Sequence, residues 1–469
     1  MLIKNKPVTL TFFITLFQTM STGVMFSLTV LYLTLSLKVT EQEAYALNAA
    51  LFSLFYCLPL VAGIVSDRLL DAKRTLIIGQ LFSIVGFFSL AALGSEILVA
   101  SLSCIAIGGA FYLPSMWKLL NSCFQGHVKK RSYYFTVAYI SLATGGVIST
   151  FSSGYIAEYL GYHSAFYIGG IYNVIALVLF ILFHRIYPTS NYQRSYRKVS
   201  FSAAAFAITF IIVYYLIQQP YISSIVIYIA GVLLVIYFSY LALQAKTVIE
   251  RKNIFLFLLF CFIACAYWSI ATLAQSNITL FAKYNLNRHI FNFEYPAGSV
   301  ISFWYISMFI CAILVCVFWY RKLQHNAFNQ KFFIGLIVTT LASITIPAAI
   351  LMSETGAQVA FFWIVIFFFF LGLGEILIQP NGNAAAGECI PEKHRGFALG
   401  AWQFAGGLGV AISGQLSMLT ITKDHTANNL ALSNQMYSQV FFYIAIVCLI
   451  FAVIAYLVGL KLHAARNTP

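Results

Sequence analysis

Glu375 offers the most chemistry by its type and position, because it is an acid inside a long apolar stretch. An ionisable side chain at membrane depth is costly unless it lines a cavity or has a partner, so such residues usually have a function. Gly372 and Gly374 precede it and Pro380 follows it, a pattern that predicts a discontinuous helix lining a binding site. We expect Glu375 to bind a proton or a substrate's cationic group; the alternative is a structural carboxylate hydrogen-bonded between helices.

A second charged cluster follows the second apolar stretch and reads Asp67-Arg68-Leu-Leu-Asp71-Ala-Lys73-Arg74. A carboxylate and a guanidinium at a helix end can bind a neighbouring helix terminus through charge-assisted hydrogen bonds. We expect Asp67, Arg68, Lys73 and Arg74 to gate the conformation of two halves that rock against each other. For Asp67, a purely structural role at a span end is the alternative.

The other polar residues give no sign of metal or redox chemistry. Cys261 and Cys265 are four residues apart, but no further ligands follow at the spacing of a zinc site. Lys118 is interpreted as an anchor that reaches toward the membrane surface, and Glu158 as a structural residue at a span end. We therefore expect no metal and no cofactor.

Membrane-spanning helices are the elements that must position these residues. A chain with 61% hydrophobic and 9% charged residues does not suit a soluble fold. A helix needs ~20 apolar residues to cross a hydrocarbon core of ~30 Å. About fourteen segments meet this requirement: 10–36, 44–66, 74–95, 97–120, 133–158, 163–186, 201–218, 221–245, 254–282, 297–320, 331–352, 358–388, 396–421 and 436–462.

The charge distribution predicts the orientation and the partners. The formal charge of +14 lies in short clusters between apolar runs, without the basic stripe of a nucleic-acid-binding protein. If both termini are cytoplasmic, the basic loops fall inside, as the positive-inside rule requires. Only Lys38, Lys283, Arg288 and Lys423 then fall outside. The lipid bilayer is thus an expected partner, and nucleic acid is not.

The longest polar connection, Arg185–Ser200, separates six segments from eight. Two of the eight, between 201 and 245, carry no charge and are expected to face lipid. We predict an all-α membrane protein with four parts: an N-terminal six-helix bundle (1–187), a cytoplasmic linker (188–200), two accessory transmembrane helices (201–250) and a C-terminal six-helix bundle (251–469). Two bundles around a central cavity are typical of secondary transporters.

Several motifs resemble those of one transporter family. The pattern Gly63-x-x-x-Asp67-Arg68 is similar to the loop signature of the major facilitator superfamily. The stretch from Phe135 through Tyr139 to Gly145 resembles the fifth-helix FYxxINxG motif of the proton-dependent oligopeptide transporter (POT/PTR) family. Gly374-Glu375 with Pro380, and Gly400-Ala-Trp402, are similar to its tenth and eleventh helices. The resemblance implies the major facilitator fold, two accessory helices as in bacterial members, and proton-coupled transport by alternating access.

The departures from the family pattern concern charged residues. The first-helix Glu and Arg correspond to Gln18 and Thr19, the fourth-helix Lys-Pro-Asn to Leu113-Pro114-Ser115, and the seventh-helix Glu to Thr272. In the family, the lost basic residues are associated with the peptide's carboxyl end, whereas the tenth-helix Glu faces the amino end. A free carboxylate would therefore lack a partner, while an amine would keep Glu375. Ordinary di- and tripeptides are disfavoured, and a small peptide-like or cationic amino compound fits better.

The matched motif positions give a set of residues expected to line the cavity. Neutral and aromatic side chains dominate it, which suits cation–π contacts with the substrate. The set is Gln18, Thr22, Tyr139, Trp268, Thr272, Trp304, Glu375 and Trp402.

The resulting hypothesis is a monomeric secondary transporter of a small molecule, driven by the proton gradient through Glu375. An enzyme is disfavoured because the spans contain no nucleophile with a base, metal set or carboxylate pair. The alternatives are a carrier of a non-peptide metabolite and an uncoupled, sensor-like carrier. The outer loop Ser353–Gln358 is short, where animal family members have a large domain. This points to a plasma-membrane protein of the bacterial inner membrane.

Overall fold

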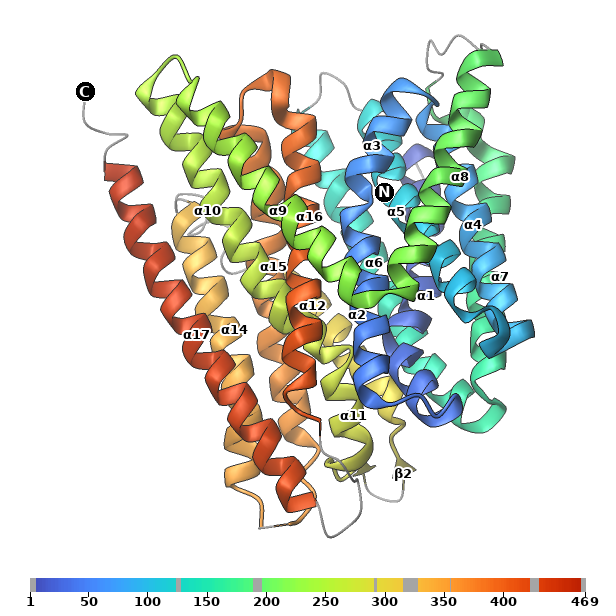
Figure 1. The fold of residues 1–469 in the computed structure, drawn as a ribbon, viewed down its shortest axis with the longest axis vertical. Coiled ribbons are helices and arrows are strands. Elements are labelled where there is room, and N and C mark those ends of the chain that lie inside the picture. The colour runs from blue at the N-terminus through green and yellow to red at the C-terminus, as the bar shows by residue number, and fades with distance from the viewer. Residues whose placement is uncertain are drawn as a thin grey trace.

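The computed structural model describes residues 6–123, 128–188, 196–290, 293–314, 328–354, 356–421 and 430–464. The side chains of 67–68, 128–139, 196–199, 328–329 and 461–464 lie outside this description. The described chain is almost entirely helical (Figure 1). Its described strands, β1 (His289–Ile290) and β2 (Phe293–Glu294), form an antiparallel hairpin that pairs His289 with Glu294.

The helices fall into three groups along the chain. The first group is α1 (Lys6–Leu31), α2 (Glu41–Cys57), α3 (Pro59–Arg68), α4 (Ala72–Leu93), α5 (Leu98–Ser122), α6 (Val128–Leu160) and α7 (Tyr162–Phe183). The accessory pair is α8 (Tyr196–Gln218) and α9 (Pro220–Leu243). The last group is α10 (Val248–Ala271), α11 (Asn277–Tyr284), α12 (Ser302–Leu314), α14 (Phe328–Leu351), α15 (Phe362–Cys389), α16 (Arg395–Met418) and α17 (Leu430–Ala464).

The predicted membrane segments are confirmed as helices over the described residues; the last part of segment 297–320, from 315 on, lies outside them. Within the described residues, twelve helical stretches are long and apolar enough to cross a membrane. One of them, Ala72–Ser122, contains both α4 and α5, and α6 adds another helix of 33 residues. Two predicted segments, 44–66 and 254–282, correspond to helix pairs, α2–α3 and α10–α11. The chain is therefore an integral membrane protein of the predicted class.

Several helices begin where the sequence supplies a capping side chain. Thr40 precedes α2 and accepts a hydrogen bond from the Glu43 backbone N–H. Thr247 precedes α10 and accepts one from Glu250 in the same way. Each threonine thus satisfies a backbone donor that the first helical turn leaves free.

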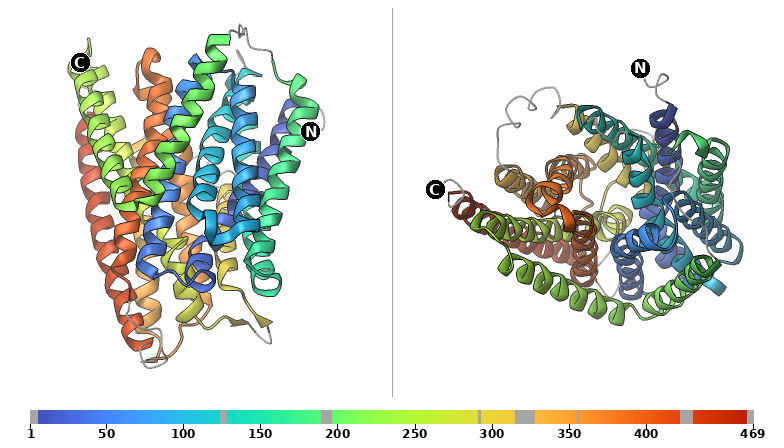
Figure 2. Two further views of the ribbon diagram at one scale, coloured as in Figure 1. Left: turned by 45° about the vertical axis from the view of Figure 1, so that its right-hand side comes forward. Right: turned by 90° about the horizontal axis from the view of Figure 1, so that it is seen from above.

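The buried apolar residues form two large clusters, one mainly from α10 to α17 and the other mainly from α1 to α8. The accessory helices contact both groups along one flank of the molecule (Figure 2). Phe206 of α8 packs against Phe111 of α5, and Tyr237 of α9 packs against Phe397 of α16. Two cores joined by an accessory pair agree with the two-bundle architecture; the domain limits themselves stay a prediction.

The two halves are joined tightly at the end of the molecule that carries the hairpin. Arg288, just before β1, donates to Glu158 of α6 at 3.4 Å and also pairs with Glu294. The Ser299 hydroxyl donates to the Phe151 carbonyl of α6 at 2.7 Å. Glu158, predicted to be structural, thus belongs to an ion pair that holds this end closed.

Candidate functional site: an acid in an aromatic cluster

Glu375 lies in the middle of α15, which runs without a break from Phe362 to Cys389. The prediction of a discontinuous helix here is therefore wrong. Pro380 is accommodated inside the helix, and the two glycines serve close packing. A Cβ atom on Gly372 would lie 2.6 Å from the Ser307 hydroxyl of α12, and one on Gly374 would lie 2.7 Å from the Thr339 hydroxyl of α14.

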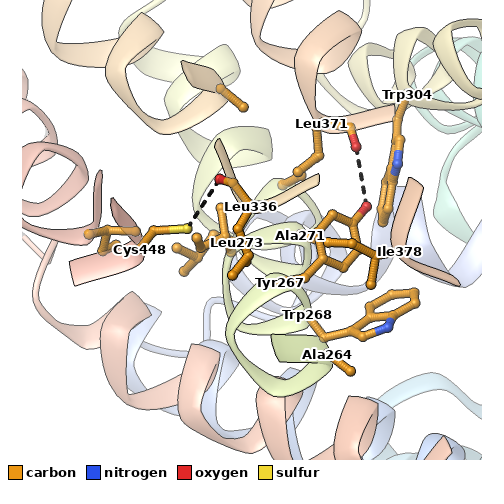
Figure 3. Packing of buried hydrophobic residues seen from close by; sticks show 14 of the residues in the cluster. Ala264, Tyr267, Trp268, Ala271, Leu273, Trp304, Leu336, Leu371, Ile378 and Cys448 are labelled. Atoms are coloured by element: carbon orange, nitrogen blue, oxygen red, sulfur yellow. Dashed lines mark hydrogen bonds between the residues drawn. The ribbon is translucent and has the colours of Figure 1, made fainter. Parts of the chain in front are cut away.

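Five aromatic side chains gather around this acid, and we call them with Glu375 the Glu375 cluster. They are Tyr56 of α2, Tyr267 and Trp268 of α10, and Trp304 and Tyr305 of α12. The Tyr267 hydroxyl lies 3.5 Å from Glu375 Oε2. Tyr56 and Tyr305 lie close enough to interact with the carboxylate electrostatically. Figure 3 shows Tyr267 beside the rings of Trp268 and Trp304.

The cluster lies where the two halves meet. Tyr56 comes from the first half, and its ring centroid is 5.0 Å from that of Trp268. Tyr305 lies against Gly146 of α6, where a Cβ atom would clash with the ring. Movement of one half past the other must therefore change the surroundings of Glu375, as a coupling residue requires.

The hydrogen bonds of Tyr267 leave room for a proton on Glu375. The Tyr267 hydroxyl can donate to the Leu371 carbonyl at 3.2 Å (Figure 3) or to Glu375 Oε2 at 3.5 Å. A phenol oxygen can accept as well as donate. A protonated Glu375 can then donate to Tyr267, which donates in turn to Leu371. Among the described residues, Glu375 has no Lys or Arg within ion-pair distance.

The predicted cavity residues divide into those that join this cluster and those that do not. Trp268 and Trp304 join it. Gln18 of α1 is 3% exposed, and neither of its amide atoms has a hydrogen-bond partner among the described residues. Thr22 bonds to the Gln18 and Thr19 carbonyls of its own helix. Tyr139 is on α6, but its side chain lies outside the described residues.

Two further predicted residues lie near the cluster without belonging to it. Trp402 of α16 donates to Gln379 of α15 at 3.1 Å and packs on Gly382, so it lies inside the C-terminal core. Thr272 follows α10 at a break in the helix and donates to the Trp268 carbonyl at 2.6 Å. Their role in substrate binding stays a prediction.

The predicted gating residues lie at the ends of α3 and α4. α3 ends at Arg68, and the side chains of Asp67 and Arg68 are outside the described residues. Asp71 caps α4 by accepting from the Arg74 backbone N–H at 2.9 Å. Lys73 donates to the Tyr187 carbonyl beyond α7 at 2.9 Å. The region thus contains helix-end contacts of the predicted kind, and the gating role itself stays a prediction.

Lys118, interpreted as a membrane-surface anchor, has a defined partner. It donates to both the carbonyl and the hydroxyl of Ser66 at 3.1 and 3.2 Å. A cation near the last turn of a helix satisfies free carbonyls there. Lys118 therefore ties α5 to the end of α3.

The sequence reasoning missed Tyr56, Tyr267 and Tyr305. Tyr267 could have been found, because it is adjacent to the predicted Trp268, and Tyr305 is adjacent to Trp304. Tyr56 is one of 29 tyrosines, and nothing in its local sequence separates it from those that face lipid.

Comparison with known proteins assigns the family. The POT family model matches residues 73–436. The chain belongs to the POT family. The major facilitator architecture and the transporter class, expected from the sequence motifs, are thereby confirmed, and the chain is a transporter of the oligopeptide-transporter type and not an enzyme.

Individual relatives cover nearly the whole chain. Dipeptide and tripeptide permease B of Photorhabdus asymbiotica is 24% identical over 96% of this chain and 94% of its own length. Dipeptide and tripeptide permease B of Salmonella typhimurium is 22% identical over 99% of this chain and 96% of its own. A structure solved for substrate recognition in proton-dependent oligopeptide transporters superposes with a TM-score of 0.85, at 19% identity, over 98% of this chain and 99% of that one.

Proposed function

We propose that this protein moves a small peptide-like or cationic amino compound by alternating access, with Glu375 carrying the coupled proton and facing the substrate's amino group. The observation that carries the proposal is a buried carboxylate among five aromatic rings, at the junction of the two halves and without a basic partner in the described chain. A carboxylate and aromatic faces together favour an organic ammonium group.

The relatives support the substrate class. Two are dipeptide and tripeptide permeases, and one solved POT transporter was determined with 5-aminolevulinic acid. The positions equivalent to the family's basic residues are neutral here, as at Thr19. We therefore expect the preferred substrate to have a free amine and an uncharged far end, such as an amidated or esterified peptide.

The coupling step needs no second acid. Glu375 holds a proton while the site is empty, with Tyr267 as hydrogen-bond acceptor. Glu375 takes this proton from the outer side. Once the carrier has closed toward the outside, the substrate's ammonium group favours the ionised carboxylate, so the proton is released to the inner side and crosses with the substrate. A ligand shifts the balance between two conformations only if it binds them with different affinity. The loss of the proton from Glu375 supplies this difference in affinity.

The test starts from a thermal-shift screen of purified protein against amines, free dipeptides and amidated dipeptides, because a ligand stabilises the state that it binds. The best compound is then offered to liposomes that contain the protein and carry an inward proton gradient. Glu375→Gln should abolish accumulation against the gradient and leave the protein folded. Accumulation by this variant would exclude Glu375 as the coupling residue.

Glu250→Gln is the matched control. Glu250 is also an acid of the second half, but it lies in the first turn of α10, where its carboxylate accepts from the Lys246 backbone N–H at 3.1 Å and Gln can accept in its place. This variant should accumulate substrate as the unchanged protein does. Loss of accumulation in both variants would mean that charge removal damages the carrier in general.

The proposal also covers the membrane location, the orientation and the oligomeric state of the protein. We infer a bacterial inner membrane location, because the relatives described above are bacterial. The basic loops support cytoplasmic termini. A tetrameric relative, PepTSo2, has been crystallised, but we propose a monomer as the functional unit because a single chain supplies every member of the Glu375 cluster.

A further inference from the structure

A small pocket lies between the two halves, one helical turn beyond Trp268 of the Glu375 cluster. It is enclosed by α2, the junction between α10 and α11, and α16. Polar residues from all three elements line it: Tyr45, Asn48, Thr272, Ser276, Ser413 and Ser417. No lining residue is charged, and hydroxyl and amide groups supply the polar surface.

Asn48 is the residue that points to a ligand. It is 5% exposed, and its side-chain oxygen has no hydrogen-bond partner among the described residues. A buried polar atom without a partner is rare in folded proteins and calls for a bound group. Tyr45, three residues earlier on the same face of α2, lines the pocket with its hydroxyl near Tyr437 and Thr420.

The helix junction contributes further oxygens. α10 ends at Ala271, a 3-10 turn covers Thr272–Ala274, and α11 begins only at Asn277. The Ser276 hydroxyl lies 3.2 Å from that of Ser417. The side-chain oxygen of neighbouring Gln275 is also buried without a partner in the described chain. Carbonyl ends of discontinuous helices coordinate cations in several transporter folds.

An acidic residue lies on the same face of α2 as the pocket residues Tyr45 and Asn48. Glu41 precedes Tyr45 by four residues and Asn48 by seven, the spacing of one face of a helix. It interacts electrostatically with Tyr45, Tyr284 and Tyr437. Its negative charge favours a cation over an anion at the pocket.

We propose that this pocket binds a small monovalent cation of the size of Na⁺, with Asn48, Thr272, Ser276 and Ser417 as oxygen ligands. Hydroxyl and amide oxygens suit hard cations. The pocket is narrow in this conformation, so an ion would bind there without its hydration shell. Thr272, one of the proposed ligands, occupies a position where the family pattern has an acid. Glu375 is not part of the proposed site.

The test measures the melting temperature of the purified protein in NaCl, LiCl, KCl and choline chloride at constant ionic strength. Na⁺ is expected to raise Tm saturably, and choline is expected to have no effect. Direct binding of ²²Na⁺ then gives the affinity. Asn48→Leu, of similar volume, should weaken that affinity at least about tenfold, equivalent to ~1.4 kcal/mol. Asn48→Asp should strengthen it, because the ligand gains a negative charge.

Two control variants make the result specific. Ser27→Ala removes a buried hydroxyl that pairs with Ser153 at 2.6 Å between α1 and α6, and it should keep the Na⁺ response. Glu375→Gln should also keep it, so failure of the proton-coupling proposal leaves this one standing. The proposal is overturned if Na⁺ and choline give the same Tm, or if Asn48→Leu binds ²²Na⁺ as tightly as the unchanged protein.

Discussion

Two helical regions of the second half behave in opposite ways. α15 contains Gly372, Gly374 and Pro380, yet it continues unbroken for 28 residues. The α10–α11 region has neither Gly nor Pro between Ala271 and Asn277, yet the helix is interrupted there. The expected helix breakers thus lie in the continuous region, and the break lies where none is expected.

The contrast shows that neighbours decide helix continuity in a membrane protein. The glycines of α15 allow α12 and α14 to approach closely, and this packing supports the helix on both sides. At the α10–α11 junction, hydroxyl and amide groups offer the backbone other partners: Ser276 donates to the Thr272 carbonyl at 3.3 Å, and Asn277 donates to the Ser417 carbonyl of α16 at 3.2 Å. Such side chains compete with the helical hydrogen bonds.

Replacement of Gly372 should have the largest effect on stability. A Cβ atom there would lie 2.9 Å from the Met308 backbone nitrogen, which cannot rotate away. Gly372→Ala should cost roughly 1–3 kcal/mol, the usual range for overpacking, and Gly372→Leu more. Thermal unfolding in detergent measures this. Gly387→Ala on the same helix is the control, because its Cβ atom meets nothing within 4 Å; equal losses for both would show that chain flexibility matters and packing does not.

Asn277→Leu tests the other region. The variant loses the two buried amide donations that tie the junction to Ser417 and Thr420, and it should destabilise the protein by about 1–3 kcal/mol. Asn381→Ala is the matched control, because Asn381 is half-buried and donates only within its own helix, to Leu377. A stability loss no larger than that of the control would contradict the idea that α16 holds the junction in place.

Tyr267→Phe should have a smaller effect, because it removes one hydroxyl and keeps the ring. Without this donor the ionised form of Glu375 is less well stabilised, so the half-saturating proton concentration for transport should fall by about 2–10-fold, the equivalent of one hydrogen bond. Transport rates across a pH series measure it. Tyr228→Phe removes a hydroxyl that donates from α9 to the Ala411 carbonyl at 3.3 Å, and its pH profile should not move.

Pro380→Ala should change the least. The proline already lies inside a continuous helix, and alanine restores a backbone donor and favours helix. Thermal unfolding should show equal or slightly higher stability, and substrate accumulation should persist. Loss of most transport would show that the proline is needed for a bend that the carrier uses.

The sequence predicted the helices well, because the hydrocarbon thickness imposes a minimum apolar length on every span. It also identified Glu375, since an acid in an apolar run is conspicuous. It did not identify Tyr56, which is brought to the cluster only when α2 packs beside α10. The sequence predicted a break in α15 and none after Ala271. Gly and Pro indicate only the intrinsic preference of the backbone against a helix. Gly372 and Asn277 act through contacts with helices that are distant in sequence.

The central claim is that Glu375 carries a proton across with the substrate and releases it to the inner side when the substrate's ammonium group takes its place. The most direct measurement follows substrate uptake and internal pH together in liposomes that contain the protein and a pH-sensitive dye, with no pH gradient imposed. A gradient of substrate alone should acidify the interior of liposomes with the unchanged protein. With Glu375→Gln, substrate should still exchange across the membrane, but the pH should stay constant. Equal acidification by both proteins would contradict the claim.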